Sequence, residues 1–164
     1  MDFQILNSLL IAAAIGSGLM GGVFYAFSSL VMPAFRKVPA DHAINVMRSI
    51  DQTVMKSSFL AVFIGTGLLS LVTGIHAVLA WEHTRSILIL AAGVIYLVGS
   101  ILVTGMRNVP LNRQLAVQKD DGLHDFWLFY TAAWTRWNHV RTIACAVACG
   151  LYILSLLIPA AKIV

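Results

Sequence analysis

Residues 59–104 decide the fold. FLAVFIGTGLLSLVTGIHAVLAW (59–81) and SILILAAGVIYLVGSILVT (86–104) are two apolar runs without a charged residue, and only EHTR (82–85) separates them. Each run has about the 20 residues that an α-helix needs to cross a bilayer. Because four residues cannot reach back across a membrane, the two runs must form a tight antiparallel helical hairpin.

Two further apolar runs, Phe3–Met32 and Thr142–Ile158, complete a set of four. Hydrophobic residues make up 59% of the 164 residues and charged residues only 11%, less than half of the roughly 25% found in soluble domains. We therefore predict an all-α integral membrane protein, a single four-helix transmembrane domain over residues 1–164. Pro33 is expected to end the first helix. No Lys or Arg precedes the first run, so we expect it to stay in the mature protein.

The connections between the four runs are unequal. Apolar and polar residues alternate with helical period over Asp41–Gln52, which predicts a short amphipathic helix at the membrane interface. Between the third and fourth runs lies a long polar stretch, Met106–Arg141. Its second half repeats aromatic residues at steps of three and four, so the fourth helix is predicted to start near Asp125 and to extend well beyond the membrane.

The distribution of basic residues predicts the orientation. The first and third connections hold nine of the eleven Lys and Arg residues, and only Arg85 and Lys162 lie elsewhere. By the positive-inside rule, we expect a multi-pass protein of the cell membrane with both long connections cytoplasmic and both termini outside. The basic residues are therefore explained by topology and lipid contact, and no nucleic-acid partner is predicted. Gly18 and Gly22, at GxxxG spacing, predict close helix packing or a homo-oligomer contact.

The segment Arg107–Arg113 (RNVPLNR) directly follows the third apolar run. We predict a proline-stiffened turn here, in which Asn108 binds the last carbonyl groups of the third helix and Asn112 caps a following helix. Turn chemistry explains each of these residues alone. The two flanking arginines favour a binding site.

The polar start of the fourth helix carries residues that recur at steps of three and four and so share one face. They are Tyr130, Trp134, Trp137, Asn138, Arg141 and Cys145. The alternative is an aromatic belt with a snorkelling arginine, but belt residues scatter around a helix. A single stripe favours a face that looks into the bundle. We expect it to meet Asn108 and Asn112 and to form one site on the cytoplasmic side, between helices 3 and 4.

Histidine and cysteine give no metal signature. No two histidines have the i, i+4 spacing of helical metal ligands, and no carboxylate completes a triad. Cys145 and Cys149 share a helix face with His139 nearby, but two small buried thiols are the simpler interpretation. We predict no metal site and no cofactor, while ligands that converge from separate helices stay open as an alternative.

Several segments together identify a resemblance. They are Phe24-Tyr25-Ala26-Phe27-Ser28, Met32-Pro33, Met47 with Ile50-Asp51, Asn108-x-Pro110-Leu111-Asn112, and Trp134-x-x-Trp137-Asn138-x-Val140-Arg141-Thr142. On these segments, over nearly the whole chain, the protein resembles the anthrone-oxygenase family of small four-helix membrane proteins. Asp51 stands where the resemblance leads us to expect asparagine.

The resemblance implies an oxidoreductase that oxygenates a flat, apolar anthrone- or hydroquinone-type substrate with O2. Such a substrate is acidic at one carbon, and its enolate reacts with oxygen without needing a metal. The catalytic candidates are Arg141, Asn138 and His139, and His139 is the only base in the cluster. The substrate-binding candidates are Asn108, Asn112, Trp134, Trp137, Tyr130 and Tyr25. Two alternatives stay open: a non-catalytic protein that binds a lipid or quinone or scaffolds a complex, and a metal- or haem-dependent redox protein.

Overall fold

The structure is a computed structural model that describes residues 2–118 and 122–158. These residues form helices and short connections, with no strand among them. The elements in chain order, where η marks a π-helix, are α1 (Phe3–Ala26), η1 (Phe27–Val31), α2 (Met32–Phe35), α3 (Ala40–Val54), α4 (Ser58–Leu79), α5 (Thr84–Tyr96), η2 (Leu97–Leu102), η3 (Thr104–Asn108), α6 (Val109–Val117) and α7 (Leu123–Leu157).

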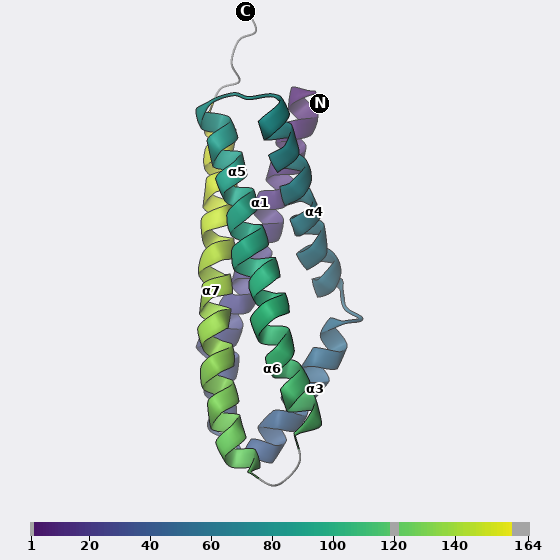
Figure 1. The fold of residues 1–164 in the computed structure, drawn as a ribbon, viewed down its shortest axis with the longest axis vertical. Coiled ribbons are helices and arrows are strands. Elements are labelled where there is room, and N and C mark those ends of the chain that lie inside the picture. Colours follow the sequence, from purple (N-terminus) through teal and green to yellow (C-terminus); the bar gives the residue numbers. More distant parts are fainter. Residues whose placement is uncertain (1, 119–121, 159–164) are drawn as a thin grey trace, which may run out of the picture.

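Four helices in the described part of the chain are long and apolar enough to cross a membrane: Phe3–Phe35, Ser58–Leu79, Thr84–Val117 and Leu123–Leu157. They run alongside one another as a bundle (Figure 1), which confirms the predicted all-α membrane fold. The 35 residues of α7 give a length of about 50 Å at roughly 1.5 Å per residue. The hydrocarbon core is about 30 Å thick, so the predicted extension of the fourth helix is confirmed.

Two prolines lie inside continuous helices, which corrects two predictions. Pro33 does not end the first helix, which continues to Phe35, and the segment around Pro110 is no turn but part of a helix that runs to Val117. A proline removes one backbone N–H and clashes with the carbonyl four residues earlier. In both helices that carbonyl belongs to a π-helical segment, η1 or η3. The wider π-helical turn accommodates the proline without ending the helix.

The predicted amphipathic helix is present as α3. It buries Ala43, Ile44 and Met47 in a cluster with residues of α6 and α7, among them Leu115 and Trp127. Arg48 ties it to the end of α6 by donating to the carbonyl oxygen of Leu115 at 3.0 Å. The helix α3 therefore closes the bundle at the end where α6 stops and α7 begins (Figure 1).

The tight connection between α4 and α5 confirms the predicted hairpin and is fixed by Arg85. This side chain is buried, with 1% of its surface exposed. It donates to Glu82 Oε2 at 3.3 Å and to the amide oxygen of Asn7 on α1. Within the connection, His83 has a φ of 43°, a strained value for a residue with a side chain. The arginine thus clamps the hairpin to the first helix.

Glycines bring the helices together at defined points. A Cβ on Gly16 would lie 2.1 Å from Thr66 Oγ1, and one on Gly99 would lie 2.4 Å from the Cβ of Ala144. Both distances are shorter than any real contact, so α1 and α4, and the third and fourth spans, approach through bare backbone. Close packing by small residues is therefore present, but at different glycines from the predicted pair.

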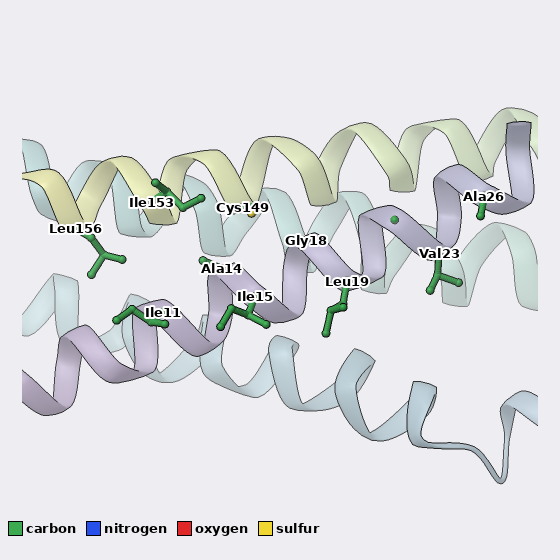
Figure 2. A pocket seen from close by; sticks show the side chains of 11 residues that line it. Ile11, Ala14, Ile15, Gly18, Leu19, Val23, Ala26, Cys149, Ile153 and Leu156 are labelled. Atoms are coloured by element: carbon green, nitrogen blue, oxygen red, sulfur yellow. The ribbon is translucent and has the colours of Figure 1, made fainter.

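The predicted GxxxG pair, Gly18 and Gly22, lines an apolar groove along α1 and α7 instead (Figure 2). Ile15, Leu19 and Ile153 are among the aliphatic side chains that border it, and none of the described residues that line it is charged. Such a surface suits lipid chains. A homo-oligomer stays a prediction.

The two ends of the bundle differ. The start of α1, the end of α7 and the α4–α5 connection lie together at one end, while α3, α6 and the start of α7 form the other (Figure 1). Of the basic residues that predicted the orientation, Lys119 and Lys162 lie outside the described residues. The side of the membrane that each end faces stays a prediction.

Candidate functional site

The site is built around the buried face of α7. Tyr130, Trp134, Asn138, Arg141 and Cys145 are all buried, and their spacing of four, four, three and four residues places them on one helix face. The predicted stripe therefore looks into the bundle. This arrangement rules out the aromatic-belt interpretation for these five residues.

Arg141 is the centre of this face. Only 5% of its surface is exposed, and its Nη1 donates to Thr104 Oγ1 at 3.2 Å. Its guanidinium carbon lies 4.2 Å from the ring centre of Phe24 and 5.2 Å from that of Trp134, within the range of cation–π attraction. Its Nε has no hydrogen-bond partner among the described residues. Arg141 thus points inward and keeps one donor free, which excludes the snorkelling arrangement.

Asn138 holds Arg141 in this position. Its Oδ1 accepts a hydrogen bond from Arg141 Nη2 at 2.6 Å. Its Nδ2 donates to the carbonyl oxygen of Phe24 at 2.5 Å and to Ser28 Oγ at 2.6 Å. Ser28 belongs to the π-helical segment η1, and Phe24 is at the end of α1 just before it. The amide therefore joins α7, the first helix and the arginine in one buried network.

Asn112 organises a second network on the neighbouring helix. Its Oδ1 accepts from Tyr130 Oη at 2.9 Å and from Trp134 Nε1 at 3.1 Å. Two donors on the oxygen orient its Nδ2 toward Asp51 Oδ1, at 2.6 Å. Asn112 therefore links α6 to α7 and α3, and the prediction that it caps a helix is wrong because it lies inside α6.

Asn108 is also inside a helix and binds across the bundle. It is buried, and its Nδ2 donates to the backbone oxygen of Trp134 at 3.3 Å. Its Oδ1 has no partner among the described residues. The prediction that it satisfies the last carbonyl groups of its own helix is wrong, because that helix does not end there. The predicted contact between the two motifs is confirmed.

A cavity of about 250 Å³ lies at this point. It is lined by residues of the first helix, α3, the start of α4, η3, α6 and α7, and by Met55 between α3 and α4. The lining residues are Val23, Phe24, Phe27, Met47, Ile50, Asp51, Val54, Met55, Phe59, Leu60, Phe63, Thr104, Asn108, Val109, Asn112, Trp134 and Arg141. Within the described part of the chain, Arg141 and Asp51 are its only charged lining residues. The two polar atoms without a partner, Arg141 Nε and Asn108 Oδ1, belong to residues of this wall.

The lining residues from Met47 to Arg141 fall within a family match, and Val23, Phe24 and Phe27 precede it. The family model for anthrone oxygenase matches residues 45–151. The chain belongs to the anthrone oxygenase family. No curated protein and no solved structure matches the chain.

Five predicted site residues of this anthrone oxygenase family member are not among the residues that line the cavity. Tyr130 and Asn138 are buried and hydrogen-bond to the lining residues Asn112 and Arg141, and the other three lie elsewhere. Trp137 is half-buried, and its ring lies 4.7 Å from the guanidinium carbon of the exposed Arg107. His139 is exposed because it lies about 100° around the helix from the buried Asn138. Tyr25, with 63% of its surface exposed, lies on the outside of α1. Direct contact between these side chains and a ligand in the cavity is therefore not supported.

Sequence reasoning missed several residues of the cavity wall. The sequence predicts no role for Asp51, and it places Thr104 in an apolar run. Phe59 and Phe63, whose rings stack with centres 5.9 Å apart, come from the start of α4. Aromatic residues in an apolar helix do not by themselves indicate a ligand cavity, because they occur in the core as well as on the lipid-facing surface. The carboxylate of Asp51, on the apolar side of an amphipathic helix, was the signal that could have been used.

No group of three or more His, Cys, Asp or Glu side chains that could hold a metal ion occurs among the described residues. Cys145 and Cys149 are free thiols, and Cys145 Sγ lies 3.4 Å from Ser100 Oγ in the helix interface. Both thiols thus take part in packing.

Proposed function

We propose that the protein oxygenates a compact, flat and apolar molecule that has an acidic C–H group conjugated with a carbonyl oxygen, and that the reaction takes place in the Arg141 cavity. The observation that carries this proposal is a buried arginine that lines an otherwise largely apolar cavity and whose Nε–H has no hydrogen-bond partner among the described residues. A buried donor without a partner costs about 1–3 kcal/mol, and more when it is charged. A ligand oxygen at this position would relieve that cost.

The walls of the cavity support a flat ligand. Rings of Phe24, Phe27, Phe59, Phe63 and Trp134 line it, and aromatic side chains bind fused rings by stacking and edge contacts. Ligand cavities generally measure from about 300 Å³ upward. A cavity of about 250 Å³ therefore suits a compact fused-ring molecule better than a whole lipid.

Arg141 would stabilise the reactive form of such a ligand. When the acidic C–H bond breaks, negative charge moves onto the conjugated oxygen. A guanidinium N–H held in place beforehand by Asn138 and Thr104 stabilises this charge more than it stabilises the neutral carbonyl. The resulting carbanion is electron-rich and reacts with O2. Asn108 Oδ1 would accept a hydrogen bond from a hydroxyl group on the same ligand.

We also propose that this end of the bundle faces the cytoplasm. Arg36, Arg48, Arg107 and Arg113 lie on the elements of that end, in agreement with the positive-inside rule. A substrate of this kind is soluble in the membrane. The cavity, between the ends of the spanning helices, can then be reached without crossing the bilayer.

The test measures O2 consumption and quinone formation by the detergent-purified protein with anthrone as the probe. Arg141→Lys keeps the charge but loses the planar group and its Nε–H, and it should lower the rate about 10²–10³-fold, as removal of a preorganised donor does. Arg107→Lys, at an exposed arginine outside the cavity, is the matched control and should leave the rate unchanged. Wild-type protein without turnover, or equal rates for the Arg141 variant and wild type, would contradict the proposal.

A further inference from the structure

Asp51 reaches the cavity from α3. It is half-buried and lines the wall beside Met47, Ile50 and Val54 of the same helix. A carboxylate on the apolar side of a helix that packs against the bundle is unfavourable unless it is hydrogen-bonded or used. Of the described residues that line the cavity, Asp51 is also the only one that can act as a base.

One oxygen of Asp51 is fixed and the other is available. Oδ1 accepts the hydrogen bond from Asn112 Nδ2 at 2.6 Å. Asn112 cannot turn away, because its own oxygen is held by Tyr130 and Trp134. Oδ2 has no hydrogen-bond partner among the described residues. The carboxylate is thus oriented by protein contacts on one side only.

The cation and the carboxylate of the cavity are not paired with each other. The described residues contain ion pairs at Asp41 and at Glu82, and none that joins Arg141 to Asp51. Opposite charges in a partly desolvated space attract strongly. Each is instead fixed by a different amide. Asn138 on α7 accepts a hydrogen bond from Arg141, and Asn112 on α6 donates one to Asp51. A ligand in the cavity would therefore contact the cation Arg141 at one point of the ligand and the base Asp51 at another.

We infer that in this chain Asp51 is the catalytic base, which takes the proton from the acidic carbon of the ligand while Arg141 binds the oxygen that becomes negative. The asparagine that the resemblance leads us to expect at this position has no basic carboxylate, so the inference concerns this chain and not the family as a whole. This inference rests on the proposed function. His139, the base expected from the sequence, is exposed on the other side of α7. General bases contribute about 10²–10⁴-fold to a rate.

The steps balance with O2 as the only co-reactant. Asp51 Oδ2 takes one proton from the CH2 carbon, and the electron pair of that C–H bond forms the enolate. The carbanion carbon then bonds to O2, which gives a hydroperoxide anion that takes back the proton from Asp51. Loss of the second hydrogen from the same carbon, with cleavage of the O–O bond, leaves a carbonyl group and releases water. The sum is CH2 plus O2 giving C=O plus H2O.

The first step can be measured without oxygen. Under anaerobic conditions in deuterated solvent, the purified protein should exchange the acidic hydrogens of anthrone faster than buffer does, followed by mass spectrometry. Asp51→Asn has the same shape and still accepts the Asn112 hydrogen bond, yet it should lower the exchange rate about 10²-fold or more. Asp41→Asn, at an exposed carboxylate of the same helix, is the matched control and should exchange like wild type.

The outcomes separate this inference from the proposed function. Quinone formation by wild type in air, together with unchanged exchange in Asp51→Asn, would overturn the role of Asp51 alone. Exchange by wild type that is lost in Asp51→Asn supports the base even where turnover in air fails. No exchange by wild type overturns the inference. Melting curves verify folding, and Asp51→Ser, a smaller polar replacement, provides the same comparison if Asp51→Asn does not fold.

Discussion

Replacing Asn138 with alanine tests the network that holds the site together. The amide makes three buried hydrogen bonds, to the Phe24 carbonyl, to Ser28 Oγ and from Arg141 Nη2. Its loss leaves the guanidinium N–H without a partner, whereas the Phe24 carbonyl keeps the backbone N–H of Phe27 and the serine hydroxyl can rotate toward another acceptor. We expect Asn138→Ala to destabilise the fold and to free Arg141.

The magnitude follows from two bounds. Hydrogen bonds between membrane helices contribute on average about 0.6 kcal/mol each, which gives roughly 2 kcal/mol for three. Leaving the buried guanidinium N–H unsatisfied costs about 1–3 kcal/mol, and more because the group is charged, which gives an upper value of roughly 4 kcal/mol. We therefore expect about 3 kcal/mol. For a chain of this size, about 2–4 °C in Tm corresponds to each kcal/mol, so Tm should fall by about 10 °C.

The assay is unfolding in mixed detergent micelles, with rising sodium dodecyl sulfate as denaturant and circular dichroism as the signal. Asn45→Ala removes the same amide from an exposed position of α3 and should change the free energy of unfolding by less than about 0.5 kcal/mol. If Asn138→Ala is no less stable than this control, the network does not hold the helices and the reasoning is refuted.

Three further predictions follow from other parts of the fold. Gly99→Ala should destabilise by about 1–3 kcal/mol, because its Cβ would lie 2.4 Å from that of Ala144. Tyr130→Phe should cost about 1 kcal/mol in the same unfolding assay, since it removes one of two donors to Asn112. A single cysteine at Arg113, in a background without other cysteines, should stay unlabelled by an impermeant maleimide in intact cells, whereas one near the N-terminus should be labelled.

Each of these has a matched control. Gly105→Ala introduces a Cβ with no atom within 4 Å and should be neutral, so equal losses at both glycines would contradict the close contact. Tyr25→Phe changes an exposed ring and should leave stability unchanged. Labelling of position 113 from outside intact cells would reverse the orientation of the bundle.

The sequence was sufficient to predict the four membrane-spanning helices and the buried face of the fourth one. Apolar runs of this length allow few structures besides membrane helices, and the steps from Trp134 to Asn138 to Arg141 fix one face by helical geometry alone. The same geometry places His139 about 100° around the helix from Asn138, away from that face. Trp137 lies at the edge of that face, where spacing cannot tell a cavity contact from the contact with Arg107 that the structure has.

The sequence was not sufficient to predict that the two prolines lie inside continuous helices. It was also not sufficient to predict the part of the cavity wall that α3 and α4 provide. Proline is a general helix-breaking signal, and no local pattern indicates that a π-helical turn will accommodate Pro33 or Pro110. Asp51 and Phe59 reach the cavity because α3 folds back beneath the bundle and α4 starts beside it. Such contacts depend on tertiary packing between distant segments, which periodicity within one segment does not report.

The central claim, that the cavity oxygenates its ligand, is tested most directly with isotopically labelled dioxygen. Purified protein is incubated with anthrone under labelled O2, and the label content of the quinone formed at early times is measured by mass spectrometry. We predict one labelled oxygen atom in each quinone molecule formed by wild type, and the same label at a much lower rate in Arg141→Lys. Quinone that carries no label, or labelled quinone formed equally fast without the protein, would contradict the claim.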